Sequence, residues 1–516
     1  MLMGIDFGTC FSTVSVMVGN TPNAYFMYDP NKTGIPTEFM YSAASGRELY
    51  GYECSSYEAA QNADQIIRYM KKQIRKSPAA LGSTVTSGGK SYTLREILKK
   101  YLSYLITEAK REAEERQLVK NTEIERVTVA APVGISAGQM TAFGYNDLLI
   151  ETVSEVAGIP KSNVYVIEEP VAAALSYFNS NGMRGKSVEG DALIFDLGGG
   201  TLDVSVVRYD KLLERYEVVA KDGLLDLGGN NWDQVLAQLV IQESGFDGKF
   251  ESKRDESDFN KKILKAKIEL SAEEEAAVNF RSGVRRYGAF ITRADFEAAT
   301  KELLDRAMEL TKKTVSECGG ISTVSRIVTV GGGSNMPAIR ERLEMEFPSL
   351  KNGGICQYEP SLAIAKGAAI YSYLGESGVD DVAAHTYGFY TRRASDNQFL
   401  IHNLIFKGQR FGVGGVITER TEGTFTAIED TQTALSFKVY ESDGKLGAGE
   451  DARWMSLGEN ANLNGVKATV NIPDEYLGKA TQYTVYVTFK LVSGKSFEIV
   501  ITDSDGNYLA SDKKQL

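Results

Sequence analysis

The sequence contains few of the residues on which secreted and zinc-binding proteins depend. Its 516 residues include only four cysteines, which are widely spaced and form no Cys-x-x-Cys pair. This distribution disfavours a disulfide framework or a zinc site and suits the reducing cytoplasm. The only two histidines, His385 and His402, occur late in the chain and are predicted to be ordinary strand residues. A histidine general base or a histidine-ligated metal is therefore disfavoured.

Long apolar runs and basic clusters are also missing. No apolar run approaches the roughly 18 residues of a transmembrane helix, and the first residues enter a predicted strand without a charged segment ahead of them. The formal net charge is −11, and no basic stripe compensates for it. We therefore expect a cytoplasmic protein with neither a membrane nor a nucleic-acid partner.

Glycine, by contrast, is abundant, and it gathers in turns that follow apolar strands. Residues 192–207 read ALIFDLGGGTLDVSVV, which predicts a strand, a glycine hairpin and a second strand. Glycines let backbone N–H groups approach an anion, and neighbouring oxygens hold a hydrated cation or a water. The residues in question are Asp196, Gly198, Gly199, Gly200, Thr201 and Asp203. The pattern predicts phosphate and metal chemistry, with an exposed glycine hairpin as the simpler alternative.

Two further turns repeat this plan. Residues 2–18 (LMGIDFGTCFSTVSVMV) place Asp6 just ahead of a glycine, and residues 328–337 place a Gly-Gly-Gly turn between a strand and a helix. Three such turns, two of them with an aspartate before the glycine, are improbable by chance. Their spacing resembles the superfamily of actin, sugar kinases and heat-shock ATPases, in which two aspartate hairpins grip the phosphates from opposite lobes.

Two charged positions leave alternatives open when they are considered alone. The apolar spacing of residues 57–77 predicts a helix, and Lys71 comes directly after Met70, a residue of its apolar face. A solvated helix lysine is the simpler interpretation of that position. Glu169 and Pro170 open a helix of small residues, where the acid either orders a water or a cation or complements the helix macrodipole.

The composition changes after Leu374. Residues 375–381 form a polar, glycine-bearing linker. From Thr386 onward, β-branched and aromatic runs alternate with turns, which predicts a compact all-β sandwich.

Together these motifs resemble the 70-kDa heat-shock chaperone family, the DnaK-like proteins, over essentially the whole chain. The matching motifs are residues 4–9 (GIDFGT), 167–174 (IEEPVAAA), 196–203 (DLGGGTLD), 227–229 (LGG) with Asp233, 291–296 (ITRADF) and 330–332 (VGG) with Pro337. The resemblance implies an α/β, actin-like, two-lobed ATPase over residues 1–375, a linker over residues 376–385 and a β-sandwich over residues 386–516. It also implies ATP hydrolysis, binding of extended polypeptide, and J-domain cochaperones and nucleotide exchange factors as partners.

The resemblance further implies roles for individual residues. Lys71, Glu169, Asp196 and Thr201 match the catalytic set, and Asp6, Asp196 and Asp203 match the set around Mg²⁺ and flanking K⁺. The implied contacts to ATP or ADP are Gly8, Thr9, Cys10, Gly198, Gly199, Gly200, Thr201, Gly228, Gly229, Lys267, Ser271, Gly331, Gly332 and Gly333. Because Lys71 matches the lysine that stabilises the γ-phosphate and the attacking water, the resemblance favours a catalytic lysine over a solvated one.

The nucleoside contacts depart from the family pattern. Leu264 and Ile268 stand where the family has a ribose-binding glutamate and an adenine-stacking arginine, and Asn335 replaces the arginine on the other adenine face. Cys10 replaces a threonine or serine. Because stacking and charged hydrogen bonds are worth about 1–3 kcal/mol each, we expect weaker or less base-selective nucleotide binding. A submicromolar dissociation constant for ATP would contradict this expectation.

The contacts between domains depart as well. Tyr165 occupies the place of an arginine used for J-domain docking, and Asp381 and Val382 are all that remains of the family's leucine-bearing linker. These departures put communication between the domains in question. No helical lid follows the sandwich in this sequence, so we expect rapid and weak peptide exchange.

Three functions remain open from the sequence. The motifs favour a divergent DnaK-like ATPase that binds polypeptide. A nucleotide-gated scaffold with little hydrolysis is favoured by the altered nucleoside contacts. It is opposed by the intact set of Asp6, Lys71, Glu169, Asp196 and Thr201. A small-molecule kinase shares the aspartate hairpins but rarely carries a β-sandwich, so residues 386–508 argue against it.

Overall fold

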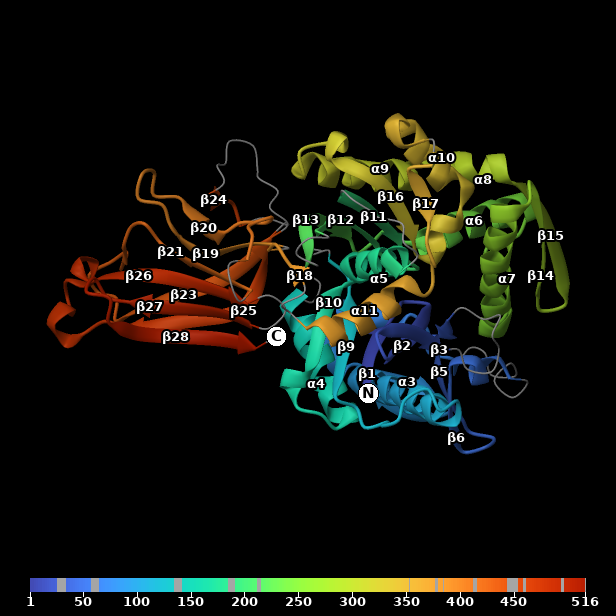
Figure 1. The fold of residues 1–516 in the computed structure, drawn as a ribbon, viewed down its shortest axis with the longest axis horizontal. Coiled ribbons are helices and arrows are strands. Elements are labelled where there is room, and N and C mark those ends of the chain that lie inside the picture. The colour runs from blue at the N-terminus through green and yellow to red at the C-terminus, as the bar shows by residue number, and fades with distance from the viewer. Residues whose placement is uncertain are drawn as a thin grey trace.

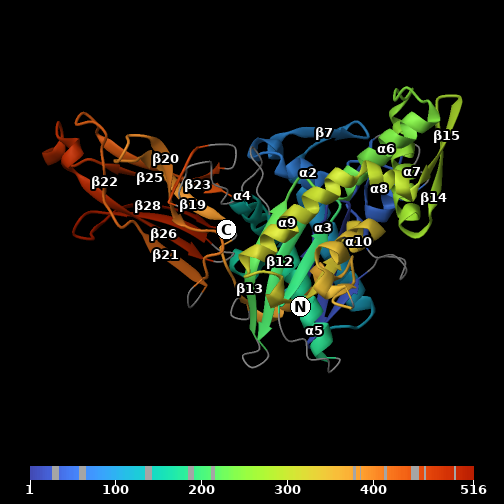
Figure 2. The same cartoon turned by 90° about the horizontal axis from the view of Figure 1, so that it is seen from above.

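The computed structural model describes residues 1–25, 34–56, 65–133, 142–183, 191–210, 215–351, 353–375, 379–383, 385–411, 415–442, 453–457, 461–492 and 496–515. Figures 1 and 2 show a mixed α/β part, which contains the N-terminus, beside a group of antiparallel strands near the C-terminus. Among these residues, no helix is both long enough and apolar enough to cross a membrane.

The α/β part is built on two six-stranded sheets with corresponding strand orders. The first has the order β10-β9-β1-β2-β3 with β4 beside β2, and the second has the order β17-β16-β11-β12-β13-β18. Strands of the first sheet are β1 (Leu2–Asp6), β2 (Phe11–Val18), β3 (Thr21–Tyr25), β4 (Ile35–Pro36), β9 (Arg126–Ala131) and β10 (Val164–Glu168). Strands of the second are β11 (Asp191–Leu197), β12 (Leu202–Asp210), β13 (Arg215–Leu224), β16 (Val324–Val330), β17 (Ile355–Gln357) and β18 (Val379–Asp380).

Each sheet contains three consecutive antiparallel strands, β1-β2-β3 in the first and β11-β12-β13 in the second, and the first of the three also pairs with a parallel strand. β1 pairs with β2 and with β9, and β11 pairs in the same way with β12 and β16. All seven residues of β11 are buried, as expected for a central strand covered on both faces. Asp6 is the last residue of β1, and Asp196 is the last but one of β11. The two predicted aspartate turns therefore occupy equivalent positions in the two sheets.

Helices α5 (Glu169–Met183) and α11 (Ala363–Leu374) lie between the two sheets (Figure 1). Their small residues allow backbone to meet backbone. A Cβ atom added to Gly367 of α11 would lie 1.6 Å from the carbonyl oxygen of Ala172 in α5. One added to Gly4 of β1 would lie 2.1 Å from the amide nitrogen of Ala369 in α11. These approaches fix the spacing of the two sheets, and with it the spacing of the two aspartate turns.

The remaining helices and hairpins lie around the two sheets, and those of residues 229–299 form a group of their own at one end (Figures 1 and 2). The helices are α2 (Met70–Arg75), α3 (Leu94–Glu115), α4 (Ala142–Ala157), α6 (Gly229–Ser244), α7 (Lys253–Ala272), α8 (Arg293–Ala299), α9 (Lys301–Glu317) and α10 (Pro337–Glu346). The hairpins are β5–β6 (Phe39–Ser42 and Arg47–Tyr50), β7–β8 (Thr84–Ser87 and Lys90–Thr93) and β14–β15 (Glu275–Ser282 and Arg285–Thr292).

The helix predicted over residues 57–77 is much shorter in the structure. Residues 57–64 lie outside the described part, and α2 begins only at Met70. Ile67 instead exchanges two backbone hydrogen bonds with Phe39, at 2.8 and 3.1 Å. Tyr69 then adopts a left-handed conformation with φ of 55°. Pairing with a neighbouring strand therefore overrides the helical pattern in residues 65–69, and that part of the prediction is wrong.

The C-terminal strands form two antiparallel sheets that share one core. One sheet has the order β24-β20-β19-β23-β25, and the other has the order β21-β26-β27-β28 with β22 beside β26. The strands are β19 (Thr386–Arg392), β20 (Phe399–Ile405), β21 (Val416–Arg420), β22 (Phe425–Thr426), β23 (Ala434–Ser442), β24 (Trp454–Met455), β25 (Ala461–Asn471), β26 (Thr484–Val492), β27 (Ser496–Thr502) and β28 (Tyr508–Gln515). The Phe389 and Phe489 rings, one from each sheet, meet at 6.0 Å in this core. His402 lies in β20 as predicted, whereas His385 precedes β19.

The segment between the two parts pairs with the second sheet. β18 runs parallel to β13, with Val379 opposite Tyr216. Ion pairs then join the C-terminal sheets to the neighbouring β13 residues. Lys407 lies 2.8 Å from Asp222, and Arg410 pairs with Glu217. The predicted linker region therefore includes a short strand of the α/β part.

The close contact at Gly367 gives a direct test of the packing. We expect Gly367→Ala to lower the free energy of unfolding by about 1–3 kcal/mol, because the added methyl group must displace the α5 backbone. Gly82→Ala is the matched control, since a Cβ atom there meets nothing within 4 Å; the control should change stability by less than about 0.5 kcal/mol. Urea unfolding measures both, and equal effects of the two substitutions would contradict the packing described above.

Candidate functional site

A buried ion pair lies between the two aspartate turns. The Lys71 ammonium of α2 is 2.5 Å from the Glu169 carboxylate at the start of α5, and both side chains are almost completely buried. Burial is the largest single effect and lowers the pKa of Lys71, but the Glu169 carboxylate together with the neighbouring acidic groups leaves that pKa raised. Lys71 is therefore a fixed cation and not a solvated helix lysine, so the simpler interpretation of its position is wrong.

Three aspartates lie within electrostatic reach of this pair. Burial, followed by the charge of Glu169, raises the pKa of Asp6 to about 7 and that of Asp203 to about 7. The same two causes also raise the pKa of Asp196. Asp203 accepts a hydrogen bond of 2.6 Å from the Val133 N–H and another from the Thr201 hydroxyl, which oppose the shift.

Two carboxylate oxygens of this group are buried without a hydrogen-bond partner among the described residues. They are Oδ1 of Asp196 and Oδ2 of Asp203. Buried polar atoms in native proteins are nearly always paired, so unpaired ones indicate a bound ion, water or ligand. The acceptors therefore fit a hydrated cation. No group of three or more histidine, cysteine, aspartate or glutamate side chains that could ligate a metal directly occurs within the described ranges.

The glycine turns of the two sheets touch each other. A Cβ atom added to Gly200 would lie 2.8 Å from the Thr9 hydroxyl, and one added to Gly199 would lie 2.7 Å from Cys10 Sγ. The turn before α6 joins them, since a Cβ atom on Gly228 would lie 2.4 Å from the Gly200 backbone. Backbone hydrogen bonds complete the contact, from the Gly229 N–H to the Gly198 carbonyl at 2.9 Å and from the Asn230 N–H to Gly199 at 2.8 Å.

The third glycine turn and α7 extend this arrangement. A Cβ atom on Gly331, whose φ is 79°, would lie 2.5 Å from the Asp196 carboxylate, and one on Gly333 would lie 2.7 Å from the Leu197 side chain. Lys267 of α7 lies 2.8 Å from Asp233 and donates to the Gly229 carbonyl at 3.0 Å. The structure thus brings most of the predicted nucleotide residues together.

Other residues predicted to bind the nucleotide have fewer contacts with the glycine turns and the aspartates. Gly8 lies in the first turn, where a Cβ atom would lie 2.0 Å from the Phe11 carbonyl oxygen, and Gly332 faces open space. The Ser271 hydroxyl donates to the Lys267 carbonyl of its own helix at 3.1 Å. The departures expected near the nucleoside are at the surface, with Leu264 38% and Ile268 62% exposed. Asn335 is exposed as well, and its side chain donates to the Gly332 carbonyl at 3.1 Å.

Sequence reasoning missed two buried residues beside the Lys71–Glu169 pair. Arg75 lies one turn beyond Lys71 on α2, and its guanidinium stands over the Tyr145 ring at 4.9 Å from the ring centroid. The four-residue spacing from Lys71 placed Arg75 on the same helix face, and that signal was available in the sequence. No motif pointed to Tyr145, which α4 brings in from another part of the chain.

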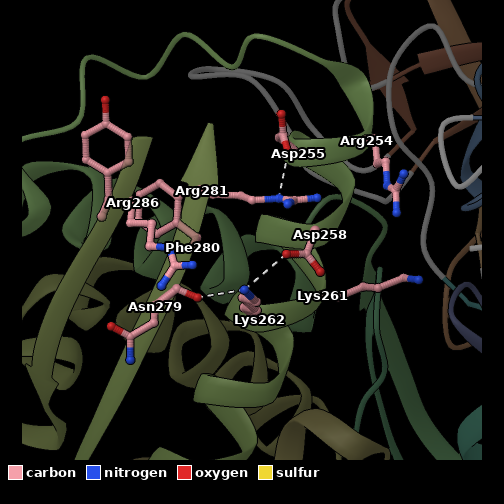
Figure 3. A pocket seen from close by; sticks show the side chains of 10 residues that line it. Arg254, Asp255, Asp258, Lys261, Lys262, Asn279, Phe280, Arg281 and Arg286 are labelled. Atoms are coloured by element: carbon pink, nitrogen blue, oxygen red, sulfur yellow. Dashed lines mark hydrogen bonds and ion pairs between the residues drawn. The ribbon is translucent and has the colours of Figure 1, made fainter. Parts of the chain in front are cut away.

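A basic hollow of about 550 Å³ lies away from these residues, between α7 and the β14–β15 hairpin (Figure 3). Its cations are partly neutralised. Lys262 lies 3.1 Å from Asp258 and donates to the Asn279 carbonyl at 2.7 Å, and Arg281 lies 3.4 Å from Asp255. None of the predicted site residues lines it.

Comparison with known proteins gives a family match and similar relatives, and these agree with each other. A family model described as "Hsp70 protein" matches residues 2–469. Two curated relatives are named chaperone protein DnaK, from the R1 and NRC-1 strains of Halobacterium salinarum. Each is 27% identical over 456 residues, which is 86% of this chain and 66% of the relative. The match thus spans slightly less than two thirds of the length of these relatives.

The buried pair can be tested without any ligand. We expect Lys71→Met to lower the free energy of unfolding by about 3 kcal/mol, because it leaves Glu169 charged and buried without its cation. Adding Glu169→Gln should restore most of that loss. Urea unfolding of the single and double variants gives the coupling energy, and strictly additive effects would contradict the pairing. Lys99→Met is the control, since its ion pair with Glu155 is 48% and 61% exposed; it should cost less than about 1 kcal/mol.

Proposed function

The chain belongs to the Hsp70 family, and on that premise we propose that it is a slow, magnesium-dependent ATPase whose C-terminal sheets bind extended polypeptide under nucleotide control. The observation that carries this proposal is the buried Lys71–Glu169 pair, set between the aspartate turns of two corresponding sheets. We assign residues 1–375 to an actin-like, two-lobed ATPase, residues 376–385 to the linker and residues 386–516 to a β-sandwich. We place the protein in the cytoplasm.

The residues around Asp196 suit a hydrated magnesium ion. Four carboxyl groups, those of Asp6, Glu169, Asp196 and Asp203, interact electrostatically with Lys71, and two of them, Asp203 and Glu169, also with Arg75. Ionised, they leave an excess of negative charge that a divalent cation and its waters would offset. Asp6, Asp196 and Asp203 would hold the ion through its water shell, with K⁺ flanking it. When bound, Mg²⁺ would neutralise charge on the phosphates.

Hydrolysis would depend on positioning and on charge, because the transition state of phosphoryl transfer is loose. Backbone N–H groups of Gly8, Thr9, Cys10 and Gly198–Gly200, with the Thr201 hydroxyl, would cradle the phosphate oxygens. The Lys71 ammonium would stabilise the γ-phosphate. Glu169 would orient both the ammonium and the attacking water, and its 2.5 Å contact with Lys71 supports this role.

The nucleoside would lie against Gly228, Gly229, Lys267, Ser271 and Gly331–Gly333. Aliphatic side chains at Leu264 and Ile268 lack the hydrogen bonds and the cationic plane that a glutamate and an arginine would provide. We therefore propose that adenosine binds more weakly, and with less base selectivity, than in typical relatives. Oxygen and nitrogen atoms of the base would find fewer charged partners here.

Nucleotide control would pass through Lys221, whose side chain is 1% exposed. Its ammonium lies 2.7 Å from Asp381 of the linker and 2.9 Å from Glu168 at the end of β10. Glu168 directly precedes Glu169, so one buried lysine connects the linker to the neighbour of the Lys71 partner. This contact offers a physical route from the neighbourhood of Lys71 to the linker, although the linker lacks the leucine run of the family. It therefore supports coupling between the two parts.

Polypeptide binding is assigned to the C-terminal sheets on family membership. J-domain cochaperones and nucleotide exchange factors are proposed partners on the same ground. At the J-domain position, the Arg126 guanidinium stands over the Tyr165 ring, at 5.1 Å from its centroid. Arg126 therefore supplies a cation beside the position where Tyr165 replaces the family's arginine.

A nucleotide-binding scaffold with little hydrolysis is the second candidate. It is favoured by the exposed Leu264 and Ile268 side chains, which weaken the nucleoside site without touching the phosphate site. Hydrolysis rates distinguish the two candidates.

The experiment is single-turnover hydrolysis of ATP and of GTP by the full chain, with and without an unfolded peptide. We expect Mg²⁺-dependent hydrolysis of ATP, accelerated by the peptide. Lys71→Ala should slow it by about 100-fold, because one preorganised charge is lost from the transition state. Lys99→Ala, in an exposed ion pair, should leave the rate unchanged. Peptide binding that is indifferent to nucleotide, with no turnover of either nucleotide, would favour the scaffold and contradict the ATPase.

A further inference from the structure

Tyr145 is a buried tyrosine whose hydroxyl has no hydrogen-bond partner among the described residues. The residue is 1% exposed, and the oxygen itself is buried. The phenol packs easily in a core, but its hydroxyl usually finds a partner when it leaves water. An unpaired hydroxyl is destabilising, so its presence calls for a ligand or a water at that position.

Tyr145 packs against the helix that carries the lysine of the buried ion pair, because Arg75, one turn beyond Lys71 on α2, lies over its ring. Lys71, Arg75, Glu169 and Asp6 all act electrostatically on Tyr145. Burial raises the pKa of Tyr145 while the two cations oppose the shift, so the phenol keeps its proton at neutral pH. Tyr145 is therefore a hydrogen-bond donor within the charge cluster.

The other unpaired oxygens of the cluster differ from the Tyr145 hydroxyl in their hydrogen-bonding capacity. Asp196 Oδ1 and Asp203 Oδ2 are acceptors when ionised and suit a cation or its waters. The Tyr145 hydroxyl can donate, so it suits an anion. Among the proposed ligands, the anion nearest to Lys71 is the terminal phosphate of the nucleotide.

Arg75 holds the tyrosine ring in this place. Its guanidinium lies 4.9 Å from the ring centroid and is itself buried. A cation above the ring face is attracted by the ring quadrupole. Arg75 also interacts electrostatically with Asp203 and Glu169, so it adds positive charge to the same cluster.

We infer that the Tyr145 hydroxyl donates a hydrogen bond to an oxygen of the terminal phosphate, and that Arg75 is the positioning residue that holds the ring. The inference rests on the proposed function, since it assigns a ligand to the same site. It adds a neutral donor to the phosphate contacts supplied by Lys71 and the glycine turns. No bond is formed or broken by Tyr145, which only orients and stabilises the phosphate.

Tyr145→Phe tests the hydroxyl, because it keeps the ring and removes only the oxygen. The readout is binding of inorganic phosphate to the full chain saturated with Mg·ADP, measured by equilibrium titration. We expect phosphate affinity to fall about tenfold, the usual effect of losing one hydrogen bond to a charged group, while Mg·ADP affinity stays within about twofold. Tyr92→Phe is the matched control. Tyr92 is also buried in this lobe, but its hydroxyl bonds to Glu48 at 3.3 Å, so phosphate affinity should not change.

Stability without ligand gives a second readout. Removing an unpaired hydroxyl should leave the melting temperature of Tyr145→Phe equal to or above that of the wild type, whereas Tyr92→Phe should lower it. A purely structural tyrosine would show the opposite, with lower stability and unchanged phosphate affinity.

The role of Arg75 is tested in the same titration. Arg75→Met should weaken phosphate binding, and its effect should shrink in the Tyr145→Phe background because the arginine acts through the ring. Full additivity would overturn the positioning role. Unchanged phosphate affinity in Tyr145→Phe, with Mg·ADP binding intact, would overturn the inference and leave the ATPase standing. Absence of Mg·ADP binding in the wild type would overturn both.

Discussion

The structure depends on the burial of more carboxyl groups than cationic groups at one place. Glu169, Asp196 and Asp203 are buried and Asp6 is half-buried, while Lys71 and Arg75 are the buried cations among them. Isolated carboxylates are costly in such surroundings, which is why burial raises the pKa values of the three aspartates. In the proposed function, a divalent cation and phosphates would offset this unfavourable arrangement.

Close backbone contacts make this burial possible. The sheets are held together by α5 and α11, where Gly367 meets the Ala172 carbonyl. Backbones also approach each other closely at the turns, where Gly228 lies next to the Gly200 backbone. Side chains at these positions would separate the turns and admit water, and water would screen the charges. The small residues far from the charges and the glycines next to them therefore both keep the turns close together and exclude water.

Much of this arrangement could be predicted from the sequence, because it is encoded in local signals. An apolar strand followed by Asp-x-Gly located Asp6 and Asp196, and Glu-Pro followed by small residues located Glu169. The helix around Lys71 was overpredicted, since pairing of Ile67 with Phe39 depends on a strand that lies distant in the sequence. Tyr145 was missed for a similar reason: nothing in its local sequence indicates that α4 brings its ring beneath the Arg75 guanidinium. Contacts of this kind arise from tertiary packing and leave no periodic signature.

The central claim is that these charges form a site for a magnesium nucleotide. Thermal unfolding of the full chain tests it most directly, with ATP in the presence of Mg²⁺ and with ATP in the presence of a chelator. A ligand that binds only the folded chain raises the melting temperature, by an increment that grows with its concentration. We predict a clear rise with Mg·ATP and a much smaller one with ATP and chelator. The same melting temperature with Mg·ATP, with ATP and chelator, and without ligand would contradict the account.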